Sequence, residues 1–238
     1  MKDELVILTR PKSNISEDIR TIRTNLQFTS AEESKVLLVT SSVPGEGKSF
    51  ISSNLAAAFA GVGETTLIID SDLRLGRIHK VFGVSNKKGL SNLLANKDVA
   101  DCRDYIKKTE IPNLYVITRG TVPPNPSELL NSNNAKKIVE FLRENFDRII
   151  FDGVPINGLP DSLIVAGLVD RVIVVCSANY TKIDELADTK KALEKIDANI
   201  AGVVVNRTSQ TKRGKYSNYY GSGKSFMKNW LSTWYDYY

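Results

Sequence analysis

Runs of aliphatic residues recur along most of the chain, and each is short enough to form one β-strand. They lie at residues 36–39, 65–70, 114–117, 148–152, 171–175 and 201–206. Within these runs apolar residues follow one another without regular polar interruption. This pattern is typical of parallel strands that are buried on both faces of a sheet.

Segments with helical signals separate these runs, at residues 15–30, 54–60, 89–94, 128–130, 135–145 and 184–195. The alternation of strands and helices predicts an α/β fold with a doubly wound, mainly parallel sheet flanked by helices, as in P-loop NTPases. Because the strand signals are evenly spaced over 238 residues, we expect one such domain rather than two.

The two ends of the chain depart from this pattern. We expect residues 1–14 to be extended, because Pro11 disfavours a helix there. From residue 207 onward aliphatic residues are scarce, and six of the nine tyrosines gather among Gly, Ser, Lys and Asn. Such a composition does not build a core. We therefore divide the chain into a domain at 1–206 and a flexible, basic, tyrosine-rich tail at 207–238.

The formal net charge of +5 lies entirely in this tail, so the preceding part of the chain is formally neutral. The basic character is therefore not that of a nucleic-acid-binding domain, and we expect no nucleic-acid partner. Five apolar tail residues could form one face of a short helix that touches a membrane or a partner, or has no role. They are Phe226, Met227, Trp230, Leu231 and Trp234.

The remaining composition argues against several other classes. No apolar run approaches the roughly 20 residues that span a membrane, and the N-terminus lacks the apolar stretch of a signal peptide. The chain has two cysteines, and Cys176 follows an apolar run as a buried thiol would. This fits a reducing cytoplasm and not a metal site. His79 is the only histidine, which favours a surface or packing role over histidine-based catalysis.

The first candidate for chemistry is the stretch VLLVTSSVPGEGKS at residues 36–49. A strand, a glycine-rich turn and a Gly-Lys-Ser that opens a helix form the layout of a phosphate-binding loop. Lys48 would reach the β- and γ-phosphates, and the Ser49 hydroxyl would bind Mg²⁺. Ser42 stands where the usual pattern has its first glycine. A second Gly-Lys-Ser, at residues 223–225, has no strand before it and is a chance match.

Carboxylates follow two of the predicted strands. Asp70 and Asp72 stand at the end of the second strand, where parallel sheets bind ligands. They could divide the handling of Mg²⁺ and the acceptance of a proton, or they could merely cap a polar loop. Asp152 closes the fourth strand in the position of a Walker-B carboxylate.

The first predicted helix has two faces. Ile15, Ile19, Ile22 and Leu26 form an apolar stripe on one of them. On the other, Glu17, Arg20 and Arg23 recur every three residues. From the spacing alone these three residues form either a solvated face with weak pairs, which is favoured, or a contact with the carboxylates of a second subunit.

Taken in order, these motifs resemble those of the bacterial tyrosine kinases of capsular and exopolysaccharide systems, a branch of the deviant Walker-A ATPases. The matching pieces are Glu17-x-x-Arg20-x-x-Arg23, VTSSVPGEGKS, LIIDSDLR, PPNPSELL at residues 123–130, IIFD at 149–152 and VVVNR. The resemblance runs from about residue 17 to residue 206 and resumes in the tyrosine-rich end.

This resemblance implies ATP and Mg²⁺ as cofactors and a role for each matching residue. Catalysis would rest on Asp70 as the base, with Lys48, Asp72 and Asp152; Mg²⁺ would be held by Ser49, Asp72 and Asp152. The nucleotide would be bound by Pro44, Gly45, Glu46, Gly47, Lys48, Ser49, Phe50 and Asn206.

The resemblance also implies an assembly. Glu17, Arg20 and Arg23 would form the contacts of a ring-shaped homo-oligomer, an octamer, which reverses the preference from spacing alone. The tail tyrosines would be autophosphorylated in trans, and their phosphate charges would oppose ring assembly. These residues are Tyr216, Tyr219, Tyr220, Tyr235, Tyr237 and Tyr238.

Further partners implied by the resemblance are a membrane adaptor of the polysaccharide co-polymerase type, which activates the kinase, and a counteracting tyrosine phosphatase. The chain would be cytoplasmic and recruited to the inner face of the membrane by this adaptor. It departs from the family at Gly153-Val154-Pro155, where Thr-Pro-Pro is usual, and at Trp230 and Trp234 in the tail.

Two other functions remain alternatives. A partitioning or septum-positioning ATPase would carry a signature lysine in the loop, where this chain has Val43. A non-catalytic, ATP-dependent scaffold for polysaccharide export would keep nucleotide binding while the altered segment after Asp152 abolishes transfer.

Overall fold

The computed structural model describes residues 4–28, 34–96 and 99–208. The tail beyond residue 208, with its six tyrosines and the apolar residues that could form a helix face, therefore lies outside the described residues, as does the predicted helix end at residues 29–30.

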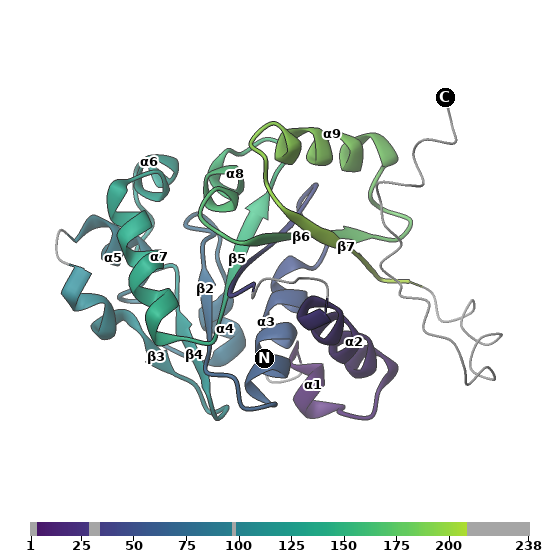
Figure 1. Cartoon of the computed structure of the whole chain (residues 1–238), viewed down its shortest axis with the longest axis horizontal. Helices are drawn as coiled ribbons and strands as arrows, with labels where there is room; N and C mark the ends of the chain where they lie inside the picture. Colours follow the sequence, from purple (N-terminus) through teal and green to yellow (C-terminus); the bar gives the residue numbers. More distant parts are fainter. Residues whose placement is uncertain (1–3, 29–33, 97–98, 209–238) are drawn as a thin grey trace.

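Within the described residues, one seven-stranded sheet runs through the molecule in the order β3-β4-β2-β5-β1-β6-β7 (Figure 1). The strands are β1 (Val36–Ser41), β2 (Thr66–Asp70), β3 (Lys107–Lys108), β4 (Leu114–Ile117), β5 (Arg148–Pro155), β6 (Arg171–Ser177) and β7 (Ile200–Asn206). The six predicted strands are confirmed, and they pair in parallel. The short β3 was not predicted, because it contains no apolar run, and it pairs with β4 as an antiparallel edge strand.

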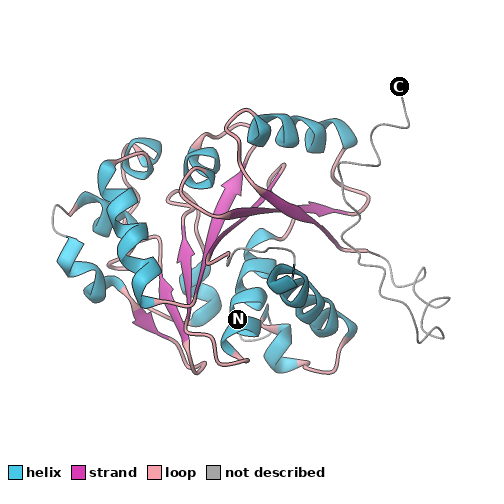
Figure 2. Cartoon of the chain, in the orientation of Figure 1, coloured by secondary structure: helices cyan, strands magenta, loops and turns pink. Residues whose placement is uncertain are grey.

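Helices cover both faces of this sheet, as Figure 2 shows. The predicted helices correspond to α2 (Asn14–Phe28), α3 (Lys48–Ala60), α5 (Leu90–Ala95), α6 (Pro126–Leu130), α7 (Asn133–Asn145) and α9 (Ile183–Glu194). Further short helices, without a clear signal in the sequence, are α4 (Ile78–Phe82), η2 (a 3₁₀ helix, Val99–Tyr105) and α8 (Asp161–Ala166). The doubly wound fold is confirmed.

The expectation of an extended N-terminus is wrong for one turn, because α1 (Val6–Thr9) is helical. Val6 and Ile7 are buried there, and the Ile7 N–H donates to Oδ1 of Asn54 on α3 at 3.1 Å. Pro11 follows the helix and does not interrupt it. Burial against α3 therefore stabilises this helix although its local sequence favours a helix only weakly.

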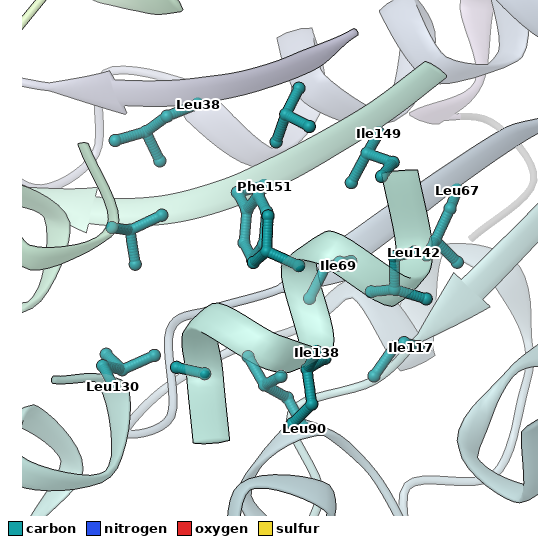
Figure 3. Packing of buried hydrophobic residues seen from close by; sticks show 14 of the residues in the cluster. Leu38, Leu67, Ile69, Leu90, Ile117, Leu130, Ile138, Leu142, Ile149 and Phe151 are labelled. Atoms are coloured by element: carbon teal, nitrogen blue, oxygen red, sulfur yellow. The ribbon is translucent and has the colours of Figure 1, made fainter. Parts of the chain in front are cut away.

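Side chains of each central strand alternate between two hydrophobic clusters. Leu38, Ile69 and Phe151 face the cluster under α5 to α9, where they meet Ile138 and Leu142 of α7 (Figure 3). Their neighbours along the strands face α1 to α4, where Leu55 and Phe59 of α3 and Ile19 of α2 are buried. Since both faces are buried, the strands are apolar throughout.

The start of β1 is fixed by a charged contact at the amino edge of the sheet. Arg143 donates to both oxygens of Asp170, Nη2 to Oδ1 at 2.6 Å and Nη1 to Oδ2 at 2.9 Å. The backbone N–H of Val36 also donates to Oδ2 of Asp170, at 2.7 Å. This contact joins the end of α7, the turn before β6 and the first residue of β1.

Candidate active site

The loop between β1 and α3 lies at the carboxyl edge of the sheet, and two glycines shape it. Gly45 and Gly47 have φ values of 83° and 97°, which side chains disfavour. Gly47 also has no room for a side chain, because a Cβ there would collide with Nδ2 of Asn206 at the end of β7. Gly45 instead faces open space, because no atom lies within 4 Å of the place that a Cβ would occupy.

Glu46 holds the loop together from within. Its carboxylate is fully buried; Oε2 accepts the N–H of Val43 at 2.9 Å, and Oε1 accepts the hydroxyl of Thr181. The Glu46 carbonyl accepts Nδ2 of Asn206 at 2.9 Å. The predicted ligand residues Glu46 and Asn206 therefore shape the loop from the inside. Thr181, 135 residues further along the chain, gave no signal in the sequence.

The loop has the features that a triphosphate requires. Lys48 and Ser49 begin α3, a helix of 13 residues whose first N–H groups and dipole favour an anion. The hydroxyl of Ser42 is buried without a partner among the described residues and is an available polar atom beside this cradle. The side chain of Phe50 packs partly against the cluster under α1 to α4, so its contribution to a ligand would come from its backbone.

Two carboxylates meet on neighbouring strands: Asp70 is the last residue of β2, whereas Asp152 lies inside β5, which continues to Pro155, beyond the predicted strand end at residue 152. Asp70 of β2 stands directly beside Asp152 of β5 in the strand register, and Asp152 also aligns with Val39 of β1. Oδ1 of Asp152 accepts the hydroxyl of Ser52 at 2.9 Å, and the Ser49 side chain favours the ionised form of the same carboxylate. Two of the three residues predicted to hold Mg²⁺, Ser49 and Asp152, thus lie close to each other, and their role as metal ligands stays a prediction.

Burial and mutual repulsion disfavour the ionised forms of Asp70 and Asp152 and so raise their pKa values. Burial raises the pKa of Asp152 to about 6, against the opposing effects of Ser49, Lys48 and Ser52. The pKa of Asp70 lies well above its usual value, through burial first and then the charge of Asp152. Oδ2 of Asp70 accepts the Ile78 N–H at 3.0 Å, whereas its buried Oδ1 has no partner among the described residues.

This donor set fits a hard cation. Carboxylate and hydroxyl oxygens are the ligands that Mg²⁺ prefers, and a positive ion would relieve the repulsion between the acids. Asp72 is half-exposed, and its Oδ1 accepts the N–H groups of Arg74 and Leu75 at 3.1 and 2.8 Å. Asp72 thus caps its own loop, which is the alternative that the sequence left open. It also directly follows Ser71, whose hydroxyl donates to the Asp152 carbonyl at 2.8 Å.

Side chains that the sequence did not single out fix the loop that carries Asp72. Nε of Arg74 donates to Oδ2 of Asp161 at 3.1 Å, and the hydroxyl of Ser127 donates to Oδ1 of the same buried carboxylate. The Arg119 guanidinium donates to the Arg74 carbonyl. These contacts connect the ends of β2 and β4 with α6 and α8.

The unusual segment after Asp152 has a packing reason. A side chain at Gly153 would collide with the Ser162 hydroxyl of α8 and with Leu38. The next residue, Val154, is held from two sides, since its carbonyl accepts the hydroxyls of Thr40 and Ser162 at 2.6 and 2.7 Å. Glycine here lets α8 approach β5 closely.

Three smaller predictions can be compared with the structure. Cys176 is buried as expected, and burial raises the pKa of its thiol to about 11. His79 is half-buried, and burial and the nearby Arg119 lower its pKa. Across the described ranges, every helix is too short or too polar to cross a bilayer.

The charged residues of α2 have partners within this chain. Arg20 forms an ion pair with Glu17 at 2.6 Å and donates to the Pro11 carbonyl at 2.9 Å. Arg23 donates to the carbonyl of Ala58 on α3 at 3.0 Å. Of the predicted apolar stripe, Ile19 and Leu26 are buried, whereas Ile15 is 40% exposed.

Comparisons with known proteins agree with this site. A family model described as an AAA domain matches residues 34–204. The putative tyrosine-protein kinase CapB of Staphylococcus aureus is 40% identical over 218 residues, which cover 91% of this chain and 95% of CapB. The tyrosine-protein kinase YwqD of Bacillus subtilis is 35% identical over 229 residues, covering 96% and 95% of the two chains.

A solved structure extends the similarity to the fold. The chimerical protein CapA2B2 superposes with a TM-score of 0.83 at 37% identity, over 87% of this chain and 91% of that protein. The fold, the phosphate-binding loop with its paired carboxylates and the two kinase relatives lead to one conclusion: the chain belongs to the family of bacterial tyrosine-protein kinases and is itself a nucleotide-binding protein-tyrosine kinase.

Proposed function

We propose that this kinase uses ATP and Mg²⁺ to phosphorylate the tail tyrosines of a neighbouring copy of the same chain. The observation that carries the proposal is the position of Asp70 on β2 beside Asp152 on β5, as a buried carboxylate with one oxygen that has no partner among the described residues. An ATPase that only hydrolyses ATP has no need of the tyrosine cluster that follows this domain.

The nucleotide would be held by the loop from Pro44 to Phe50 and by Asn206, with Lys48 on the phosphates. Ser49, Asp72 and Asp152 would hold Mg²⁺, which neutralises charge on the phosphates when it is bound. The contacts of Glu46 with Val43 and Thr181 keep the cradle formed before a ligand enters, so little ordering is left to the binding step.

Asp70 would act as the base. The tyrosine hydroxyl would give its proton to this carboxylate while its oxygen bonds to the γ-phosphorus, and ADP would leave with the electrons of the broken P–O bond. The raised pKa of Asp70, due first to burial, makes its ionised form a stronger base than an exposed aspartate. The Arg74 and Arg119 contacts keep the adjacent loop in place.

The assembly is part of the same proposal. Residues 1–206 form the kinase domain and 207–238 the substrate tail. Glu17, Arg20 and Arg23 join copies into a ring, an octamer, in which one tail reaches the next active site. The similarity to CapA2B2, whose name joins two parts, supports a separate membrane adaptor as activator. The kinase then acts at the inner face of the membrane in capsule or exopolysaccharide production, opposed by a tyrosine phosphatase.

The test is incubation of the full chain with ATP and Mg²⁺ in the presence of the adaptor's cytoplasmic segment. Anti-phosphotyrosine detection and mass spectrometry should find phosphate on the tail tyrosines. Lys48→Met and Asp70→Ala should abolish this signal, because they remove the phosphate-binding amine and the base. Lys137→Met and Asp188→Ala, at exposed positions on α7 and α9, are matched controls that should keep it.

ATP hydrolysis without any phosphotyrosine would contradict the proposal. Nucleotide binding with neither hydrolysis nor phosphotyrosine would favour the export scaffold instead. In a mixture, phosphate on the tail of a Lys48→Met chain supplied by an active chain would establish transfer in trans.

A further inference from the structure

Three of the nine tyrosines lie in the described part of the chain, and they differ in accessibility. Tyr105 is 9% exposed and belongs to the core. Tyr115 packs edge-on against Phe146, with 5.6 Å between the ring centres. Tyr180 is 56% exposed. Among the described tyrosines, Tyr180 alone offers an open side chain to a kinase.

Tyr180 lies in the turn between β6 and α9, and this turn is well fixed. The N–H groups of Tyr180 and Thr181 both donate to the Ser177 carbonyl at 3.1 Å. The N–H of Ser177 donates back to the Thr181 hydroxyl oxygen at 2.8 Å. The backbone of Tyr180 is therefore held at one place in the turn that follows β6.

From this turn the side chain reaches the phosphate-binding loop. The Tyr180 hydroxyl donates to the carbonyl of Pro44 at 3.3 Å. The adjacent Thr181 donates to the buried carboxylate of Glu46. One accessible tyrosine hydroxyl thus touches the backbone of the loop that cradles the nucleotide phosphates.

A phosphoryl group on this hydroxyl would alter the loop in two ways. The ester oxygen has no proton, so its hydrogen bond to the Pro44 carbonyl would be lost. The group would also bring close to two negative charges to a loop that already contains the Glu46 carboxylate and that must hold a triphosphate. Like charges at this range oppose binding.

We propose that Tyr180 is a phosphorylation site of this kinase and that its phosphorylation weakens nucleotide binding at the adjacent loop. The γ-phosphoryl group of ATP passes to the Tyr180 oxygen, the hydroxyl proton goes to the carboxylate base of the donating copy, and ADP leaves. Phosphorylated Tyr180 accumulates as the kinase turns over, and the kinase is increasingly inhibited by its own activity. The proposal rests on the tyrosine-kinase activity and adds a site and a consequence to it.

The test compares nucleotide affinity before and after phosphorylation in the wild-type chain and in Tyr180→Phe. Both full-length proteins are dephosphorylated, then incubated with ATP and Mg²⁺ beside the adaptor segment. Phosphosites are located by mass spectrometry, and the affinity for ADP is measured by calorimetry. Wild-type affinity should fall about tenfold or more on phosphorylation, whereas that of Tyr180→Phe should stay within about twofold. Comparison within each variant removes the effect of the lost Pro44 contact.

Phosphate on the tail tyrosines but none on Tyr180 would overturn this inference and leave the proposed function standing. An equal loss of affinity in both proteins would also overturn it, because the tail phosphates would then be the cause. Absence of all phosphotyrosine would overturn the proposed function and this inference together.

Discussion

Asp170 and Arg143 form a two-pronged ion pair that also binds the first backbone N–H of β1. Burial alone would raise the pKa of Asp170, but the bonds from Arg143 and from the Val36 N–H outweigh it and hold the pKa below its usual value. The ionised carboxylate is therefore bound more tightly in the folded chain than in the unfolded one.

Asp170→Asn should lower the free energy of unfolding by about 1–3 kcal/mol at neutral pH, because a charged acceptor of three hydrogen bonds is lost. Since the folded pKa lies below the unfolded one, the difference from wild type should be complete above about pH 4–5 and shrink as the pH falls further. Urea unfolding at several pH values measures this. Glu194→Gln removes the half-exposed partner of Lys190 on α9 and should change stability by less than about 0.5 kcal/mol.

Gly47→Ala should greatly weaken nucleotide binding, because the new methyl group meets the Asn206 amide and the residue keeps a positive φ. Gly63→Ala is the matched control, with a φ of 95° and no atom within 4 Å. It should cost about 1–2 kcal/mol of stability through backbone strain and leave nucleotide affinity unchanged. Calorimetry with ADP and thermal unfolding separate the two effects. Equal nucleotide affinities in the two variants would refute the role of the Asn206 contact.

Glu46→Ala should loosen the loop, because the Val43 N–H and the Thr181 hydroxyl lose their buried acceptor. We expect about 1–3 kcal/mol less stability together with weaker nucleotide binding. Glu46→Gln keeps one oxygen for Val43 and should fall between the alanine variant and the wild type. Equal nucleotide affinity in Gln and Ala, both below that of the wild type, would show that the negative charge, and not the hydrogen bonds, matters here, because both variants lack the charge.

Arg20→Ala and Arg23→Ala should both reduce the mass of the assembly in light scattering, but their effects on stability should differ. Arg23 links α2 to the Ala58 carbonyl of α3, so its loss should cost about 1 kcal/mol of unfolding free energy. Arg20 pairs with the exposed Glu17, and its loss should cost less than about 0.5 kcal/mol.

Lys12→Ala, exposed just before α2, serves as the charge control for these variants and should keep the full mass. An unchanged mass in Arg20→Ala would show that Arg20 belongs to a solvated helix face and makes no contact between subunits. If only Arg23→Ala lowers the mass, the assembly is lost because the contact between α2 and α3 within one chain is altered.

The sequence predicts the strands well because their burial on both faces leaves an unbroken apolar run, as at Leu37, Leu38 and Val39. It predicts the phosphate-binding loop because strand, glycine turn and helix lie within 25 consecutive residues, 36–60. Asp70 and Asp152 could be placed at the same side of the sheet because each follows the apolar run of a strand in one parallel sheet.

The missed features depend on contacts between distant parts of the chain. α1 is stabilised by Asn54, and β3 has no apolar residue to announce it. Arg74 meets Asp161 across 87 positions, and Thr181 meets Glu46 across 135. No local pattern in the sequence records such a partner, since each is an ordinary polar residue until the sheet brings the two together.

The hydrogen bond from Asn206 to the Glu46 carbonyl spans 160 positions, and this has a consequence for the order of synthesis. The loop leaves the ribosome long before β7, so a nascent chain carries a phosphate-binding motif without the side chain that closes it. The closure of the loop by Asn206 must then wait until β7 has paired with β6. We infer that the phosphate-binding loop reaches its final shape only when the last described strand is in place.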